Sequence, residues 1–192
     1  MYRNIVVLTG AGISRAAGLA TYRGPGGLWS DPKLEVLSHV DALATHRTEA
    51  TDMFWAMHQA VGGVEPTAAH RMLASFEERN PGMLIVTQNV DGLHQRAGSR
   101  RVVEYHGSLR HWRCERCARR VEPPAGAAPT CCDERMRPDA VLFGELIPAA
   151  AEHEVTRALR TCDLFVAIGT SGTVWPAAGF VKSAAYSGAR ED

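Results

Sequence analysis

Short apolar runs recur along the chain, and each one ends in glycine or in polar residues. Residues 5–8, 83–86, 101–105 and 164–168 are each too short for a helix and are rich in branched side chains. Such runs are typical of buried parallel strands. The last of the four has the most uniformly apolar composition, so we expect it to be fully buried.

Longer segments with helical spacing separate these runs. Residues 47–61 and 148–159 carry apolar side chains on one face, and 66–79 has a stripe of Ala69, Met72, Leu73 and Phe76. Pro66 suits the first turn of that helix. Segments 90–97 and 176–185 are also compatible with helices. Strands that alternate with helices predict an α/β fold built on a parallel sheet.

The first strand runs directly into Gly10-Ala11-Gly12, and a segment compatible with a helix begins at Ile13. A strand, a glycine turn and a helix bring backbone N–H groups up to a pyrophosphate, and a side chain at Gly10 or Gly12 would obstruct that approach. The match to the dinucleotide pattern is incomplete, because Arg15 stands where a third glycine is expected. By itself the turn is equally compatible with an α/β protein that binds no dinucleotide.

Polar side chains follow three of the predicted strands. Gln88, Asn89 and Asp91 follow the second, His106 follows the third, and Gly169-Thr170-Ser171 follows the fourth. Ligands bind at this edge of an open α/β sheet, and a histidine there can accept a proton near neutral pH. An Asn/Asp turn that caps a helix, and a purely structural histidine, are the alternatives.

Two cysteine pairs bracket a proline-rich loop: Cys114 with Cys117, and Cys131 with Cys132. Four thiolates in this arrangement predict a structural zinc site, although the adjacent second pair strains the usual knuckle. A redox CxxC motif, or a ribbon that has lost its metal, is the alternative. Cys162 stands alone and is interpreted as a small buried residue.

Composition narrows the possible functions. The 192 residues include 21 basic and 21 acidic ones, so the formal net charge is zero, which argues against a nucleic-acid partner. No apolar run reaches membrane-spanning length, and the first strand leaves no room for a signal peptide. With an odd number of cysteines, these features predict a reducing, cytoplasmic location.

Taken together, the stretches GAGIS, TYRG, TQNVDGLH, YHG, RPDAVLFGE and IGTSG resemble the sirtuin family of NAD-dependent protein-lysine deacylases. The resemblance covers nearly the whole chain and is greatest for the bacterial class III, or desuccinylase-type, branch. It implies a Rossmann-like parallel sheet with helices on both faces. It also implies a single catalytic domain over 1–192, with residues 111–138 as a small zinc-ribbon insert.

The resemblance also assigns roles to residues. His106 would be the general base, with Asn89 beside it in catalysis. The products would be nicotinamide and O-acyl-ADP-ribose, and Zn²⁺ would be held by the four cysteines. The NAD-binding residues would be Gly10, Ala11, Gly12, Ile13, Tyr22, Arg23, Trp29, Gln88, Asn89, Asp91, Gly169, Thr170 and Ser171.

The substrate implied by the resemblance is an acyl-lysine protein or peptide. Val141 and Phe143 would line the acyl-lysine tunnel, and the backbone of 141–145 would pair with the peptide. Desuccinylases carry Tyr and Arg three residues apart on the helix facing the acyl group, and we place Trp55 and His58 at those positions. Because neutral histidine grips a carboxylate less well than arginine, we expect neutral acyl groups such as acetyl to be preferred over succinyl.

The C-terminus departs from the family pattern, since the sequence ends where a further strand should begin. We therefore expect an unpaired neighbouring strand and a weakened adenosine site. Two other functions stay open: an ADP-ribosyltransferase on the same fold, and a catalytically impaired NAD- or peptide-binding domain. The protein substrates and the oligomeric state are not readable from the sequence.

Overall fold

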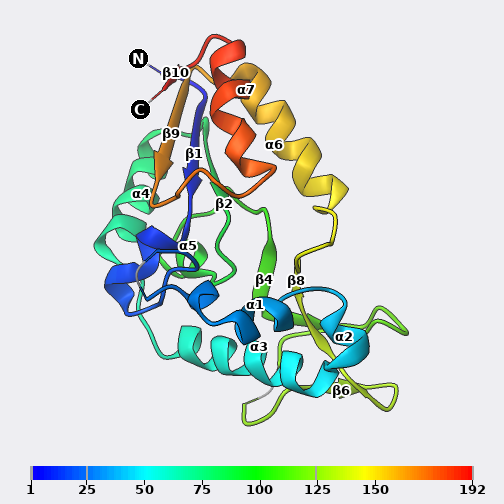
Figure 1. The fold of residues 1–192 in the computed structure, drawn as a ribbon. Helices are drawn as coiled ribbons and strands as arrows, with labels where there is room; N and C mark the ends of the chain where they lie inside the picture. Colours follow the sequence, from blue (N-terminus) through cyan, green and yellow to red (C-terminus); the bar gives the residue numbers. More distant parts are fainter. Residues whose placement is uncertain (1, 25, 124, 192) are drawn as a thin grey trace.

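The computed structural model describes residues 2–24, 26–123 and 125–191. A parallel sheet covered by helices forms the upper part of Figure 1, and one long and two short helices with antiparallel strands form a smaller lower body. The N- and C-terminal ends lie side by side at the top of the sheet.

The upper sheet contains five parallel strands in the order β10-β9-β1-β2-β3. β1 lies at its centre, where Ile5 is in register with both Met83 and Leu164. The four predicted strands are therefore confirmed. Their bounds are β1 Ile5–Thr9, β2 Met83–Thr87, β3 Val102–Glu104, β9 Leu164–Ile168 and β10 Arg190–Glu191.

Helices cover both faces of this sheet, as predicted. Side chains alternate along β1, so Val6 and Leu8 face one layer while Ile5 and Val7 face the other. The first layer contains α6 (Ala149–Thr161) and α7 (Phe180–Tyr186), and the second contains α4 (Ala68–Arg79) with the 3₁₀ turn η1 (Ala11–Ala17).

β9 differs from the prediction of a fully buried strand. Phe165 is buried in the core, whereas Ala167 is exposed. β10 pairs only with Leu164 and Phe165, so the second half of β9 lies at the sheet edge. The expected unpaired edge on β9 is found only in part, because β10 pairs with Leu164 and Phe165 but not with the rest of that edge.

The predicted apolar stripe of α4 is confirmed only in part, because Ala69 and Leu73 pack in the core but Met72 and Phe76 do not. Met72 is 63% exposed and Phe76 is 38% exposed, while His70 and Glu77 are buried. Polar contacts orient the helix this way, since the Glu77 carboxylate accepts hydrogen bonds from the backbone N–H groups that lead into β3. Pro66 precedes the helix, which begins after its N-cap, Thr67.

The smaller body packs α3 (Arg47–Gly62) against an antiparallel sheet of β5-β4-β8. Trp112 is completely buried at the centre of this body, in a cluster with Leu109 and Phe54. The helix predicted at 47–61 is confirmed. The remaining elements are η2 Leu28–Ser30, α1 Pro32–Leu37, α2 Ala42–Thr45, α5 Leu93–Arg96, β4 Gly107–Arg113, β5 Arg120–Val121, β6 Thr130–Cys131, β7 Glu134–Arg135, β8 Arg137–Ala140 and η3 Ala177–Gly179.

Within the described residues, no helix is both long enough and apolar enough to cross a bilayer.

A buried histidine pair joins α4 to α5 beneath the end of β1. The His70 and His94 rings lie 4.7 Å apart, His94 Nε2 is 2.9 Å from Thr9 Oγ1, and His70 Nδ1 is 2.8 Å from Thr67 Oγ1. Burial lowers the pKa of His94 to about 3 and also lowers that of His70. Both rings are therefore neutral in the folded protein at pH 7.

We predict that the protein loses stability as the pH falls below about 6.5. The unfolded chain then binds protons at His70 and His94 that the folded chain excludes, at a cost of up to about 1.4 kcal/mol per pH unit for each histidine. Thermal unfolding between pH 7.5 and 5 measures this slope. His94→Gln should flatten it, whereas His153→Gln, at an exposed site on α6, should not. An unchanged slope in His94→Gln would contradict the prediction.

Candidate active site and metal centre

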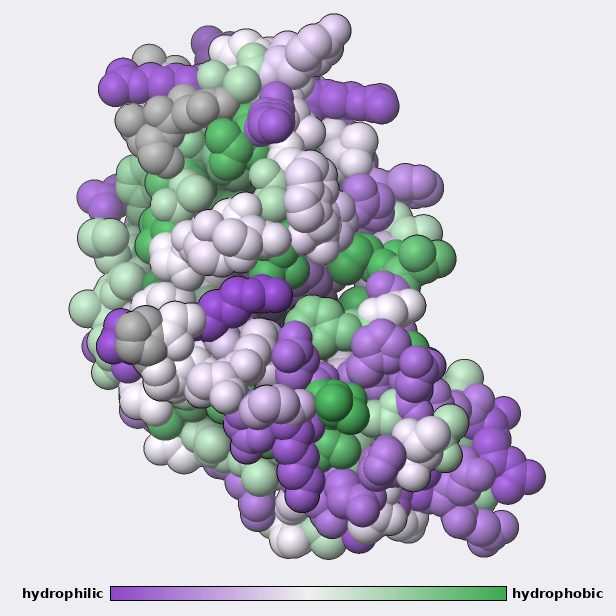
Figure 2. Space-filling view, viewed as in Figure 1, coloured by the Kyte–Doolittle hydropathy of each residue, from purple (hydrophilic) through white to green (hydrophobic). Residues whose placement is uncertain are grey.

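A cavity of about 480 Å³ lies where the carboxyl ends of the parallel strands meet the smaller body. Figure 2 shows the surface hollowed between the upper and lower parts of the molecule. The structure brings most of the predicted cofactor residues to this wall. They are Gly10, Ala11, Gly12, Tyr22, Arg23, Trp29, Gln88, Asn89, Gly169, Thr170 and Ser171.

The two glycines of the first turn are required for a reason that the sequence did not reveal. A Cβ on Gly10 or on Gly12 would lie 2.8 Å from the backbone of Gly169. Their N–H groups donate to Ile168 and Gly169 carbonyls. These glycines thus let the turn after β1 pack directly on the turn after β9, which fixes the cavity edge. That a side chain at either position would also obstruct a ligand stays a prediction.

A buried polar network supports Asn89 at the wall. Asn89 Nδ2 donates to the Gly10 carbonyl and to Ser14 Oγ, each at 3.2 Å, and Ser14 Oγ donates to Asp91 Oδ2 at 2.7 Å. Asn89 Oδ1 is buried and has no hydrogen-bond partner among the described residues. An orphaned acceptor on a cavity wall fits a ligand that carries donors, such as an amide or a sugar hydroxyl.

Asp91 and Ile13 are the two predicted cofactor residues that the structure does not place on the wall. Asp91 uses one carboxylate oxygen for Ser14 and the other for the backbone N–H of Leu93. Ile13 is 5% exposed and packs in the core beneath the sheet. Asp91 therefore orients Ser14 and, through it, Asn89 from the side away from the cavity. Ile13 fixes the turn after β1 to the core.

His106 also lines the cavity, immediately before β4. Its Nδ1 lies 3.1 Å from the Gln88 carbonyl oxygen, which accepts only if Nδ1 carries the proton. Nε2 then bears the lone pair. Burial lowers the pKa of His106, and the hydrogen bond to Gln88 only partly opposes this. The ring is therefore a neutral base at pH 7.

Aromatic rings join the loop after η1 to the opposite wall. Tyr22 stacks on Trp29 with ring centroids 5.1 Å apart, and Trp29 meets Phe143 edge-on at 5.4 Å. Two backbone hydrogen bonds hold the ends of this loop together, from Leu28 N to Thr21 O and from Trp29 N to Tyr22 O. We call the loop from Tyr22 to Trp29 the flap; its Pro25 lies outside the described residues.

The face of α3 that meets the cavity differs from the prediction. Phe54 and Met57 line the wall, while Trp55 and His58 lie one helical step away. Trp55 stacks on His58 and meets Trp112 edge-on, and His58 Nδ1 is 3.0 Å from the Leu109 carbonyl oxygen. The role of Trp55 and His58 in the acyl pocket stays a prediction: their rings pack in the smaller body, and His58 contacts Leu109, which lines the cavity.

Val141 and Phe143 line the cavity as predicted, but their loop is less open to strand pairing than expected. Four of the five backbone N–H groups from 141 to 145 already have acceptors within the chain. Phe143 is bonded on both sides, to the Ser38 carbonyl and the Val40 N–H. The expected pairing of the whole segment with a peptide therefore fails at Phe143.

Several residues in or behind the cavity wall were not predicted from the sequence. Ser14 is buried behind Asn89, and its position two residues after Gly12 is the available signal. Val174 and Trp175 also line the cavity, and Trp175 is 72% exposed. An exposed tryptophan shortly after a glycine-rich turn could have indicated them.

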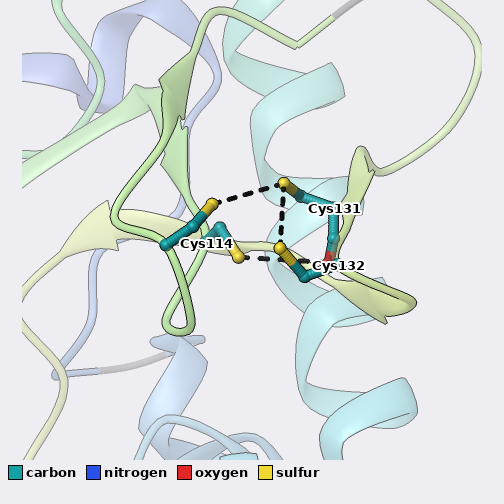
Figure 3. Close-up of side chains that lie close together, drawn as sticks. Cys114, Cys131 and Cys132 are labelled. Atoms are coloured by element: carbon teal, nitrogen blue, oxygen red, sulfur yellow. Dashed lines mark hydrogen bonds between the residues drawn. The ribbon is translucent and has the colours of Figure 1, made fainter.

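The four predicted metal ligands converge. Figure 3 shows the sulfurs of Cys114, Cys131 and Cys132 turned toward a common centre. The sulfur of Cys131 lies 3.6 Å from that of Cys117 and 3.8 Å from that of Cys132, and all four sulfurs lie within 4.8 Å of one another. Four sulfurs bound tetrahedrally to zinc are about 3.8 Å apart, so the cluster fits the ion.

The thiol pKa values agree with a metal site. Hydrogen bonding from the Cys117 backbone lowers the pKa of Cys114 to about 7. Hydrogen bonds with the thiols of Cys117, Cys131 and Cys114 raise the pKa of Cys132 to about 12. Without a cation the four sulfurs cannot all be ionised, because each thiolate raises the pKa of its neighbours. A cation at the centre stabilises all four thiolates together.

Comparison with known proteins decides the family. A model described as the Sir2 family matches residues 10–176. The chain belongs to the Sir2 family. It is 45% identical to an NAD-dependent protein deacylase of Shewanella oneidensis, over 99% of this chain and 81% of the relative. It is 40% identical to an NAD-dependent protein deacetylase of Rhodopseudomonas palustris, over 97% and 79% of the two chains.

Solved Sir2 structures share the fold closely. A Sir2 homologue mutant in complex with ADP-ribose superposes with a TM-score of 0.92 at 34% identity, covering 99% of this chain and 79% of that one. A Sir2 homologue in complex with NAD gives a TM-score of 0.88 at 35% identity, over 99% and 77%.

We predict one zinc ion per chain, bound by the cysteine cluster. Cys132→Ala should lose the metal, because three thiolates leave an open coordination position. Metal analysis of the purified protein measures the ratio. Cys162→Ala is the matched control, since Cys162 is buried in the upper core away from the cluster. Full zinc content in Cys132→Ala would remove Cys132 from the ligand set.

Proposed function

We propose that this Sir2-family chain is an NAD-dependent protein-lysine deacylase that releases nicotinamide and O-acyl-ADP-ribose. The main support is that one cavity wall presents both a neutral histidine base and a buried amide oxygen without a hydrogen-bond partner in the described chain. His106 presents an unprotonated Nε2, and Asn89 presents an unpartnered Oδ1. The relatives named as deacylases and deacetylases support the same activity.

NAD would lie along the turns after β1, β2 and β9, within reach of Gly10, Asn89 and Thr170. When bound, it supplies an electrophilic ribose carbon whose bond to nicotinamide is broken. Gln88 would orient the sugar end, because its amide is already fixed by a 2.9 Å hydrogen bond to Thr170 Oγ1. Tyr22 and Trp29 would cover the reacting centre and exclude water.

His106 would accept a proton at Nε2 from a ribose hydroxyl. The Gln88 carbonyl holds the other ring nitrogen protonated and so keeps Nε2 available. Asn89 would accept a hydrogen bond at Oδ1, which its buried amide is held in place to do. Ser14 and Asp91 support Asn89 from behind.

The substrate would be an acyl-lysine on a protein or peptide, with the lysine entering between Val141 and Phe143. We treat 1–192 as one catalytic domain with 111–138 as its zinc-binding insert, and a reducing compartment such as the cytoplasm suits its thiolates. An ADP-ribosyltransferase and an impaired binding domain are not favoured, because the relatives are deacylases and the base is intact.

The acyl group would be neutral. The wall near α3 is apolar, formed by Phe54, Met57, Val90 and Leu109. Arg23 is the cavity's arginine among the described lining residues, and it lies on the flap. A succinyl carboxylate placed against Met57 would lose its water without gaining a cation. We therefore propose that acetyl is preferred over succinyl, because the cavity wall at Met57 offers no cation to the succinyl carboxylate.

We predict that His106→Ala abolishes peptide-dependent nicotinamide release while NAD still binds. In the wild type, kcat/KM should decline only below pH 6.5, because burial keeps the His106 pKa below its ordinary value. Chromatography of nicotinamide and titration calorimetry with NAD measure the two properties. His111→Gln, outside the cavity lining, is the control. Near wild-type turnover in His106→Ala would exclude His106 as the base.

We predict that kcat/KM is higher for an acetyl-lysine peptide than for the succinyl peptide by at least about tenfold, the value of one charged hydrogen bond. Met57→Arg should narrow this ratio, since a guanidinium can grip the carboxylate. His58→Arg should change the ratio less, because the His58 ring is bonded to the Leu109 carbonyl and His58 is not among the described lining residues. A larger response in His58→Arg than in Met57→Arg would overturn the assignment of the cavity face.

A further inference from the structure

An ion pair between buried Arg137 and part-buried Glu145 lies at the two ends of the loop that forms the substrate side of the cavity, and Glu145 also lines that cavity. Arg137 is completely buried at the start of β8, and its guanidinium donates to both carboxylate oxygens of Glu145 at 2.6 and 2.7 Å. The two residues bracket the segment containing Val141 and Phe143. Parallel bonds of this kind fix distance and orientation together.

The pair holds the loop at two further points. Arg137 Nη2 also donates to the Ala140 carbonyl at 2.8 Å, and Glu145 Oε2 accepts the Leu142 backbone N–H at 2.8 Å. Burial alone would raise the pKa of Glu145, but the bonds from Arg137 and Leu142 outweigh burial and hold that pKa below its usual range. The carboxylate is therefore charged whenever the loop is in this conformation.

The pair has its own support in the smaller body. Glu115, between the first two metal-site cysteines, places Oε1 3.7 Å from Arg137, and its other oxygen accepts from Arg47 of α3 at 2.6 Å. Arg113 of β4 lies 3.7 Å from Glu145. The loop is thus fastened to α3, to β4 and to the cysteine knuckle through charged groups.

We propose that Arg137 and Glu145 are positioning residues that hold the 140–145 loop in the conformation that accepts the acyl-lysine peptide. This inference rests on the proposed deacylase function and adds a specific role for two residues that do not react. The Val141 N–H donates to the His106 carbonyl at 2.8 Å, so the fixed loop also keeps its register with the base.

The contacts separate peptide binding from cofactor binding. The turns that would hold NAD follow β1, β2 and β9, whereas Arg137 and Glu145 act on the loop after β8. We call the Arg137–Glu145 pair the clamp. Breaking it should therefore weaken peptide binding and leave NAD binding intact. A general loss of folding would weaken both equally.

The test uses the full zinc-loaded chain with Glu145→Gln, Arg137→Lys and the double variant Arg137→Met with Glu145→Gln. The double variant guards against misfolding, since it leaves no unpaired buried charge. We expect the peptide KM to rise at least about tenfold in Glu145→Gln and in the double variant, with kcat and the NAD Kd within about twofold. Arg137→Lys keeps the charge, so its peptide KM should lie between that of these variants and that of the wild type.

Arg120→Gln is the matched control. Arg120 pairs with Asp139 at 2.7 Å in the same region but has no hydrogen bond or ion pair with 140–145 within the described chain, so the peptide KM of this variant should not change. An unchanged peptide KM in folded Glu145→Gln, or an equal loss of NAD binding, would overturn the proposal.

Hydrogen exchange separates this inference from the proposed function. The amide of Leu142 should exchange faster in Glu145→Gln, while the amides of β2 should not change. A wild-type chain that releases no nicotinamide would refute the deacylase assignment even if this exchange result holds. Unchanged exchange at Leu142 would refute the clamp even if the wild type is fully active.

Discussion

The close contact between two glycine turns determines where everything else in the cavity can lie. With any Cβ on Gly10 or Gly12, the turn after β1 could not approach the turn after β9, and a Cβ on Gly169 would meet the Ile13 nitrogen at 2.4 Å. This contact fixes the backbone carbonyl of Gly10, to which the Asn89 amide donates. The absence of side chains at these glycines thus determines the position of the cavity edge, and Asn89 is positioned by its hydrogen bond to that edge.

Much of the upper body could be predicted from local pattern, because its strands are continuous apolar runs that end in glycine or polar residues. The failures occurred where tertiary contacts override periodicity. α4 turns His70 and Glu77 inward because each finds buried partners, and apolar spacing carries no information about such partners. The exposed half of β9 depends on the length of its neighbouring strand, which its own sequence does not encode.

The candidate site could be predicted residue by residue where short motifs hold the chemistry, as at Asn89, His106 and the four cysteines. Sequence alone could not decide which residues of α3 line the cavity, because one step along the helix changes the face. Phe54 and Met57 reach the cavity while Trp55 and His58 turn into the smaller body. A 100° step per residue follows from helix geometry, but the rotation of the helix about its axis depends on packing with Trp112 and Leu109.

The hydrogen-bonding state of the 141–145 segment bears on which proteins could be recognised. Its amide donors are mostly engaged inside the chain, while the carbonyls of Val141 and Gly144 have no backbone partner within the described chain. A surface that offers mainly acceptors binds the main chain of the incoming peptide rather than its side chains, and every residue except proline can donate a backbone N–H to it. In the proposed enzyme, selection among proteins would then depend on which lysines lie in extended, accessible segments, with little demand on the surrounding sequence.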